Sequence, residues 1–328
     1  MTETSRHDAA AAHPRSVKLI RTFRAKLHDL EHKLDGAEVR AANGIRATNT
    51  ARANGWQDAG EDILEKCAPC FTLSAGRSGT MTLAQLGALS PQLESVHEPL
   101  PHLLTESFLC HRGDVGDATF WDAVIAEARD WPIRNAYRKG RNWFETNNRL
   151  TFLAPHLAQR YPRSRFIVLV RHPEAFAESA IARGYYKDHV WDFARIRPQS
   201  LDPDHDRWPQ MSQLEKVGWL WRSTYEIADR LSETIDPDRV LVMRSEDLFK
   251  NQGDAVNNLF TFASSDPPPQ ASIASLLAQK SNAGEPSERI PQHRVGSERT
   301  QALFSPSRAT YAAIRLRAEI ARNTRQAG

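Results

Sequence analysis

Short apolar runs alternate along the middle of the chain with longer segments in which apolar residues recur every three or four positions. The short runs have the length and the β-branched or aromatic content of strands, and the longer segments have the period of helices. The predicted strands cover residues 70–74, 95–97, 143–146, 166–170 and 240–244. The predicted helices cover residues 80–89, 119–129, 150–160, 175–183 and 214–234. This alternation predicts an α/β fold with a central parallel sheet that is covered by helices on both faces.

The segments on either side of this alternation have other patterns. Between residues 14 and 35, apolar residues recur at three- and four-residue steps: Val17, Ile20, Phe23, Leu27, Leu30 and Leu34. This stripe is typical of a short coiled coil, which would make the chain a homodimer, and equally of a helix that packs on the chain's own body. Residues 37–60 are predicted to be a connector, and residues 307–324 a last helix. We therefore expect an N-terminal helical extension, residues 1–66, and one main domain, residues 67–328.

Composition adds limits on the partners and the location of the chain. The chain has 328 residues, of which 40% are hydrophobic and 25% charged, and its formal net charge is +3. These values are typical of a globular protein and argue against a nucleic-acid partner held by bulk charge, while a local anion pocket remains open. No apolar run is long enough to span a bilayer and no signal-peptide core is visible, so we expect a cytoplasmic protein. Cys67, Cys70 and Cys110 are expected to be reduced cysteines rather than a redox pair or a metal half-site.

The most informative motif comes directly after the first predicted strand. Residues 74–80 read SAGRSGT, and a predicted helix begins at their end. Glycines allow the backbone to approach an anion closely, and the N–H groups at a helix N-terminus attract it. A Walker A loop has two glycines separated by four residues, followed by Lys and Ser or Thr, and this loop has neither that spacing nor the lysine. With Arg77 and the hydroxyls of Ser78, Thr80 and Thr82, the loop is predicted to bind phosphate but not to be an NTPase loop.

A second anion site is predicted after the buried strand at residues 166–170. Arg171 comes directly after this strand, and Ser179 lies eight residues further on, in the next predicted helix. Open parallel sheets bind ligands at the carboxyl ends of their strands, so both residues are expected at the same edge as the loop at residues 74–80. A forked guanidinium and a hydroxyl suit a phosphate. Two phosphate sites at one edge indicate a nucleoside that carries phosphates at both ends.

With these motifs, the chain resembles the sulfotransferases that use 3′-phosphoadenosine 5′-phosphosulfate (PAPS). The segment GRSGT resembles their 5′-phosphosulfate loop, PKSGT or PRSGT, and RHPEAFAES resembles their 3′-phosphate block. HEPLPH is similar to a segment of the carbohydrate sulfotransferases, and RVLVMRSEDL to a strand and turn of the family, so the resemblance covers residues 68–300. The resemblance is to a bacterial-type soluble member of the family, and its motifs are closest in style to those of the carbohydrate sulfotransferases. It implies a P-loop-like three-layer fold.

The resemblance also implies the cofactor and the site residues. The co-substrate would be PAPS, no metal would be needed, and the acceptor would be a hydroxyl or amine of a carbohydrate or another small molecule. The 5′-phosphate would be held by the first loop, with Arg77 at the leaving oxygen: Gly76, Arg77, Ser78, Gly79, Thr80 and Thr82. The 3′-phosphate would be held by Arg171 and Ser179, and Arg294 and Gly296 faintly match the family's C-terminal binding segment. Cytosolic members have Lys at the position of Arg77 and often an aromatic residue near Thr82, so the adenine contact is unassigned here.

The base that takes the acceptor proton is predicted to be Glu98 or His97, which are adjacent after the second predicted strand. The carbohydrate branch of the family uses Glu and the cytosolic small-molecule branch uses His, and the pair Glu98-Pro99 matches the first pattern. Successive side chains of a strand point to opposite faces, so only one of the two is expected to face the site. Two other functions stay open: a nucleotide-dependent phosphotransferase, which would need Mg²⁺, and a non-catalytic nucleotide-binding protein.

Two further segments are predicted to lie near the site. Residues 145–149, ETNNR, end a strand at the same edge, where they would contact the ligand or cap the next helix through an asparagine. Residues 184–210 carry aromatic and charged side chains without a clear period. Such a stretch is typical of a lid or binding loop and equally of ordinary packing.

Overall fold

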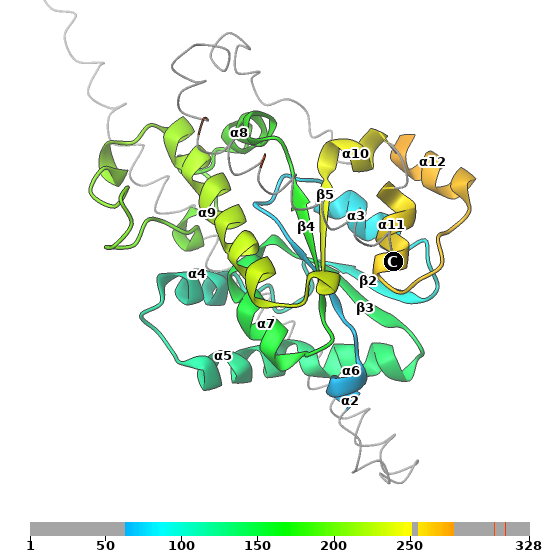
Figure 1. Cartoon of the computed structure of the whole chain (residues 1–328). Coiled ribbons are helices and arrows are strands. Elements are labelled where there is room, and N and C mark those ends of the chain that lie inside the picture. The colour runs from blue at the N-terminus through cyan, green and yellow to red at the C-terminus, as the bar shows by residue number, and fades with distance from the viewer. Residues whose placement is uncertain (1–62, 251–254, 279–304, 306–311, 313–328) are drawn as a thin grey trace, which may run out of the picture.

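The structure is a computed structural model that describes residues 63–250, 255–278, 305 and 312 (Figure 1). Several predictions from the sequence lie outside the described residues. They are the helix at residues 14–35, the connector at 37–60, the last helix at 307–324, and the two site residues Arg294 and Gly296.

A five-stranded sheet with all neighbouring strands parallel forms the centre of the described part of the chain. Its strands are β1 Cys70–Leu73, β2 Leu93–His97, β3 Asn142–Thr146, β4 Arg165–Val170 and β5 Val240–Arg244. They lie in the order β2-β3-β1-β4-β5. The α/β fold with a parallel sheet is therefore confirmed, and each of the five predicted strands is present.

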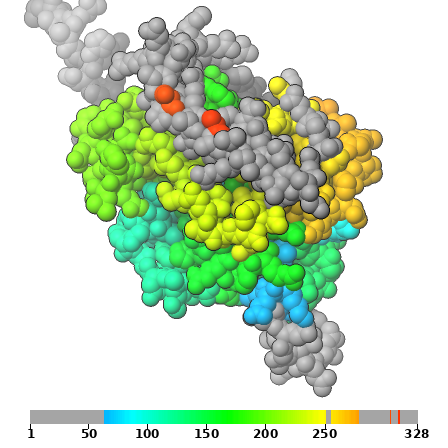
Figure 2. Space-filling view, in the orientation of Figure 1, coloured from blue at the N-terminus to red at the C-terminus, as the bar shows by residue number. Residues whose placement is uncertain are grey.

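Helices precede, connect and follow these strands. The longer ones are α3 Thr80–Gly87, α4 Leu104–Arg112, α5 Ala118–Ile125, α6 Trp131–Arg138, α7 Ala154–Arg160, α8 Pro173–Ala182, α9 Gln213–Thr234, α11 Ala255–Phe262 and α12 Gln270–Ala278. The shorter ones are α2 Ile63–Lys66, the π-helix η1 Ala126–Asp130, α10 Ser245–Lys250 and the 3₁₀ turns η2 Asn148–Leu153, η3 Asp192–Ala194, η4 Trp208–Gln210 and η5 Pro237–Arg239. In the space-filling view α9 crosses the visible face, with the segment 183–212 at its left and the orange helices α11 and α12 at the right (Figure 2).

Hydrophobic packing covers both faces of the sheet. Phe166, Val168 and Val170 of β4 belong to one cluster, which also contains residues of α5, α7, α8 and α9. The alternate residues Ile167 and Leu169 belong to a second cluster, with residues of α3, α11 and α12. Because both sides of the strand are buried, β4 stands in the sequence as a continuous apolar run instead of an alternating one.

The strand order places a change of direction at β1. The chain passes from β1 to β2 and β3 on one side, and then crosses to β4 and β5 on the other side of β1. At such a point the connections that leave β1 and β4 diverge, and ligands of open α/β sheets bind in the resulting crevice at the carboxyl ends. The two predicted phosphate segments come directly after these two strands.

The three cysteines are free, as expected. Cys67 and Cys70 are buried, and the Sγ of Cys110 donates to the carbonyl of Phe152. Burial raises the pKa of Cys70 to about 12 and that of Cys110 to about 11, so both stay thiols at neutral pH. Within the described ranges, no group of His, Cys, Asp and Glu side chains could hold a metal ion, and no helix is long and apolar enough to cross a membrane.

Candidate functional site

The loop between β1 and α3 has a left-handed backbone at three positions. Gly76 has φ +78°, Arg77 has φ +52° and Gly79 has φ +92°. Side chains beneath the loop hold this conformation: the Ser74 hydroxyl accepts from the N–H of Gly76 at 3.0 Å. In the described part of the chain no side chain caps the N-terminus of α3, which starts at Thr80. The loop therefore presents a helix N-terminus, with its partial positive charge, toward the carboxyl edge of the sheet.

Ser78 supports this loop from below. Its side chain is completely buried, and its hydroxyl donates to the carbonyl of Gly76 at 2.9 Å and lies 3.3 Å from the hydroxyl of Tyr225. Tyr225, on α9, in turn donates to the carbonyl of Leu169 at 2.8 Å, and Ser245 donates to the carbonyl of Ser78 at 2.6 Å. The predicted phosphate contact of the Ser78 hydroxyl thus competes with bonds inside the protein. Sequence reasoning missed Tyr225, which lies in no recognisable motif, and it assigned no contact to Ser245, although that residue lies in the segment RVLVMRSEDL.

The two predicted phosphate segments meet at one edge, as their positions after parallel strands indicated. The Nε of Arg77 donates to the hydroxyl of Ser179 at 3.1 Å, and Nη1 of Arg171 donates to the carbonyl of Arg77 at 2.7 Å. Burial is the first cause that lowers the pKa of both arginines, and for Arg77 the charges of Arg183 and Arg171 lower it further. Two partly desolvated guanidinium groups that repel each other favour an anion between them.

A cavity of about 590 Å³ lies over this edge. Its wall includes every predicted residue of the first loop except Ser78, together with Arg171 and Ser179: Gly76, Arg77, Gly79, Thr80 and Thr82. A third cation, Lys250, and the ring of Phe249 belong to the same wall, both on α10. This first cavity combines three cations with an uncapped helix N-terminus, an arrangement that suits a ligand with more than one phosphate.

His97 and Glu98 both line the first cavity, so the expectation that only one of them faces the site is wrong. The strand β2 ends at His97, and Glu98 has a left-handed φ of +43° that breaks the alternation of side chains. The Nδ1 of His97 lies 2.9 Å from the Thr146 hydroxyl, and Glu98 forms an ion pair with Nη1 of Arg149 at 2.8 Å. Arg149 belongs to the segment 145–149 that was predicted to lie at this edge, but its ion pair with Glu98 was not predicted.

A second cavity, of about 220 Å³, adjoins the first. Glu98, Asn148 and Tyr185 line both cavities, so Glu98 lies where the two cavities meet. The rest of the wall comes partly from the segment 184–210, including His189, Trp191 and Arg195, and partly from α4, η2 and α9. The structure therefore brings part of that segment to a cavity beside the first site.

Arg195 and His189, both in the wall of the second cavity, hold each other in place. The guanidinium of Arg195 stacks 3.5 Å from the ring centre of Tyr185 and donates through Nε to Asp192 at 2.8 Å. It also lies 3.0 Å from Nδ1 of His189, which accepts the N–H of Trp191 at 3.2 Å. Burial, followed by the charge of Arg195, lowers the pKa of His189 to about 4. His189 is therefore neutral at neutral pH, and because Nδ1 accepts, its ring proton is on Nε2.

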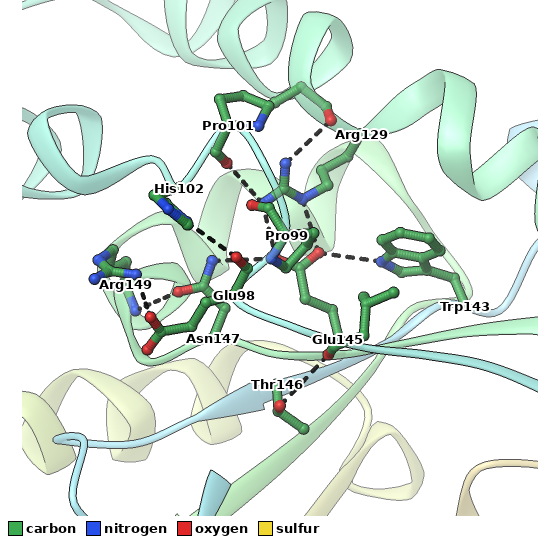
Figure 3. A network of polar contacts seen from close by, with 12 residues as sticks. Glu98, Pro99, Pro101, His102, Arg129, Trp143, Glu145, Thr146, Asn147 and Arg149 are labelled. Carbon is green, nitrogen blue, oxygen red and sulfur yellow. Dashed lines mark hydrogen bonds and ion pairs between the residues drawn. The ribbon is translucent and has the colours of Figure 1, made fainter. Parts of the chain in front are cut away.

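Behind Glu98 lies a buried polar network (Figure 3). Arg129 and Glu145 are both fully buried and form a two-pronged ion pair, with Nε and Nη2 of Arg129 donating to the carboxylate at 2.7 and 2.8 Å. Trp143 Nε1 and Asn147 Nδ2 donate to the same carboxylate, at 3.1 and 3.2 Å. Asn147 also caps η2, because its side chain accepts the N–H of Arg149. For residues 145–149, the predicted asparagine cap of the next helix is therefore present, and the side chain of Glu145 is buried inside the protein.

Comparison with known proteins finds no matching family model and no matching curated protein. The solved structures similar to this chain include the sulfotransferase domain from the curacin biosynthetic pathway, with 18% identity over 64% of this chain and 77% of that one, at a TM-score of 0.43. A second is the sulfotransferase domain from the Synechococcus PCC 7002 olefin synthase, with 18% identity, 74% and 88% coverage and a TM-score of 0.43. A third is a sulfotransferase from Alicyclobacillus acidocaldarius, with 15% identity, 77% and 94% coverage and a TM-score of 0.44. At these values the likeness does not show family membership, and the case for a function rests on the site.

Proposed function

We propose that the chain is a sulfotransferase that moves a sulfuryl group from PAPS to a hydroxyl, or an amine, of a carbohydrate or another small acceptor. The observation that carries the proposal is the place of Glu98. Glu98 lies in the walls of two adjoining cavities, and the wall of the first also contains three cationic side chains and a helix N-terminus. A group-transfer enzyme needs this arrangement of an anionic donor, an acceptor and a base at the junction between them.

The first cavity is the proposed donor site. Gly76, Gly79, Thr80 and Thr82, with the N-terminus of α3, hold the 5′-phosphate, in agreement with the resemblance of GRSGT to the family's loop. Arg171 and Ser179 hold the 3′-phosphate. The contact between Arg77 and Ser179 supports one continuous ligand across both segments, because it brings the two groups within 3.1 Å.

The second cavity is the proposed acceptor site. PAPS supplies a sulfuryl group: the acceptor oxygen bonds to sulfur while the bond from sulfur to the 5′-phosphate oxygen breaks. Arg77 stabilises the charge that develops on the leaving oxygen. Glu98 takes the acceptor proton, and His97, on the wall of the first cavity, is the alternative base. The chemistry that this site performs is positioning and charge stabilisation, and it needs no metal.

The experiment that tests the proposal is a thermal-shift titration with 3′-phosphoadenosine 5′-phosphate. AMP, and ATP with and without Mg²⁺, are the comparison ligands. At 100 times its dissociation constant a ligand adds about 2.7 kcal/mol of stability, which a melting curve resolves. We expect a shift with the bisphosphate alone, without metal, and then turnover of labelled PAPS in an acceptor screen. A shift only with ATP and Mg²⁺ would support a phosphotransferase instead, and binding without turnover on any acceptor would support a non-catalytic protein.

A further inference from the structure

We propose that the buried ion pair of Arg129 and Glu145 is a positioning device that fixes Glu98 at the junction of the two cavities. The inference rests on the proposed function, because it concerns the residue assigned there as the base. Neither residue of the pair lines either cavity. Both act on Glu98 through intermediate groups, along two routes that Figure 3 draws.

The first route runs through the backbone C-terminal to Glu98. The Nη2 of Arg129 donates to the carbonyl of Pro101 at 3.1 Å and lies 3.4 Å from that of Pro99. These carbonyls belong to the turn between β2 and α4, which starts at Glu98 with φ +43° and ends at Leu103 with φ +57°. A left-handed backbone at a residue other than glycine persists only when its surroundings hold it. Arg129 is the charged group that holds this turn from the side of the core.

The second route runs to the side chain of Glu98. Asn147 donates through Nδ2 to Glu145, and its Oδ1 accepts the N–H of Arg149 at 3.1 Å. Arg149 then donates through Nη1 to the carboxylate of Glu98 at 2.8 Å. The buried carboxylate of Glu145 thereby fixes Asn147, which holds the backbone of Arg149, the partner of Glu98. Backbone and side chain of Glu98 are both connected to one buried pair.

Stability alone does not explain the pair. Moving two charges into the interior is costly, and apolar residues of similar size often serve as well or better. Arg129 lies in the π-helix η1, whose geometry is uncommon and often found near functional sites. A misplacement of about 1 Å at a reacting group costs on the order of a hundredfold in rate. A rigid support for Glu98 therefore gives the ion pair a functional value that its contribution to stability does not explain.

The test replaces the pair and monitors the turn. In the double variant R129M/E145L the charges leave together, so that no buried charge stays without its partner. R129K is a second variant that keeps the charge but loses the fork. The matched control is R160M, since Arg160 forms ion pairs with Asp122 of α5 and with Asp130, the last residue of η1, without contacting the Glu98 turn. Hydrogen exchange is measured in each at the four residues of this turn that have an amide N–H, Glu98, Leu100, His102 and Leu103, with the affinity for 3′-phosphoadenosine 5′-phosphate. The rate of sulfuryl transfer to 4-nitrophenol, with kcat and the KM for PAPS separated, is the third measurement.

We expect exchange in residues 98–103 to accelerate about tenfold or more in the double variant and in R129K, with R160M like the wild type. Bisphosphate affinity and the KM for PAPS should stay within about twofold while kcat falls about 10- to 100-fold, because the donor cavity has other supports. Exchange of this turn at the wild-type rate in both variants would overturn the inference. A loss of bisphosphate affinity as large as the loss of kcat would also overturn it. If the wild type does not bind the bisphosphate, the proposed function fails, and the exchange rates still decide whether the pair holds the turn.

Discussion

Glu98 is the residue in which the proposed chemistry concentrates, and its surroundings separate it from its neighbour. Its side chain is 29% exposed and pairs with Arg149, and Glu98 lines both cavities. His97 lines the first cavity, and its Nδ1 is already engaged by the carbonyl and the hydroxyl of Thr146. An acceptor in the second cavity therefore meets Glu98 and not His97. This difference can be measured.

We predict that Glu98→Gln lowers turnover of PAPS by about 10²- to 10⁴-fold, the usual contribution of a positioned base, and that His97→Ala lowers it much less. Both variants should keep their affinity for 3′-phosphoadenosine 5′-phosphate in calorimetry. Glu94→Gln is the matched control, because Glu94 lies on β2, the strand that ends directly before Glu98, and its carboxylate pairs with Arg141 away from the cavities. A larger loss in His97→Ala than in Glu98→Gln would assign the base to His97.

At the residue scale, the sequence predicts the positions of side chains that lie directly after strand ends. Arg77, Arg171 and Ser179 could be placed together because residues after neighbouring parallel strands share one edge. Tyr225 and Arg129 could not be placed, since their contacts join segments far apart in the chain and no motif marks them. The face of Glu98 could not be predicted either, because a positive φ cancels the alternation of a strand and the sequence does not show it.

At the scale of elements, strands were predicted better than helix boundaries. The predicted helix at residues 119–129 is α5 followed by η1, and the chain continues as α6 to Arg138. Pro132, near the start of α6, has no N–H to donate to the carbonyl of Ala128, which instead accepts from Nη1 of Arg129. The predicted helix ends at residue 129, whereas the structure continues through the π-helix into α6.

The short helix α10 gives a prediction about the nucleotide base. Phe249, on α10, is 44% exposed and lines the first cavity. Its ring packs so closely on Gly79 that a Cβ added to Gly79 would lie 2.7 Å from the ring. We predict that the adenine of the donor stacks on Phe249, a contact worth about 1–3 kcal/mol. Phe249→Ala should then weaken binding of 3′-phosphoadenosine 5′-phosphate about tenfold, while ribose bisphosphate, which has no base, binds as before.

The matched control for this variant is Phe120→Ala. Phe120, on α5, is 43% exposed and lines neither cavity. Calorimetry with the two ligands separates the alternatives. If Phe249→Ala weakens both ligands equally, the ring supports the Gly79 loop rather than the base, and the stacking prediction is wrong.

For the whole molecule, local charge decides more than net charge. The chain carries only +3 overall, yet the carboxyl edge of the sheet gathers Arg77, Arg171 and Lys250 around one cavity. This is why composition could only exclude bulk nucleic-acid binding, while strand order and motif position could locate an anion site. A cytoplasmic location and a homodimer through residues 14–35 stay predictions, and the latter lies outside the described residues.

The stability of the whole molecule should fall in mild acid because of three histidines. Burial is the first cause that lowers the pKa of His111, His156 and His189, the last to about 4. In the unfolded chain a histidine has an ordinary pKa near 6.5. Between about pH 6.5 and 4 the unfolded chain therefore binds more protons than the folded one. By linkage, the free energy of unfolding decreases as the pH falls through this window.

His189 is the group with which to check this expectation. Arg195, Arg183 and Arg77 oppose its protonation and Asp192 favours it, so the net effect of its surroundings keeps the ring neutral. Its contribution to the slope is at most about 1.4 kcal/mol per pH unit, and less because solvent reaches the half-buried ring. Urea unfolding at a series of pH values from 4 to 7 should show a shallower decline in His189→Asn than in the wild type. Parallel curves for the two proteins would mean that His189 takes up its proton in the folded state as readily as in the unfolded chain.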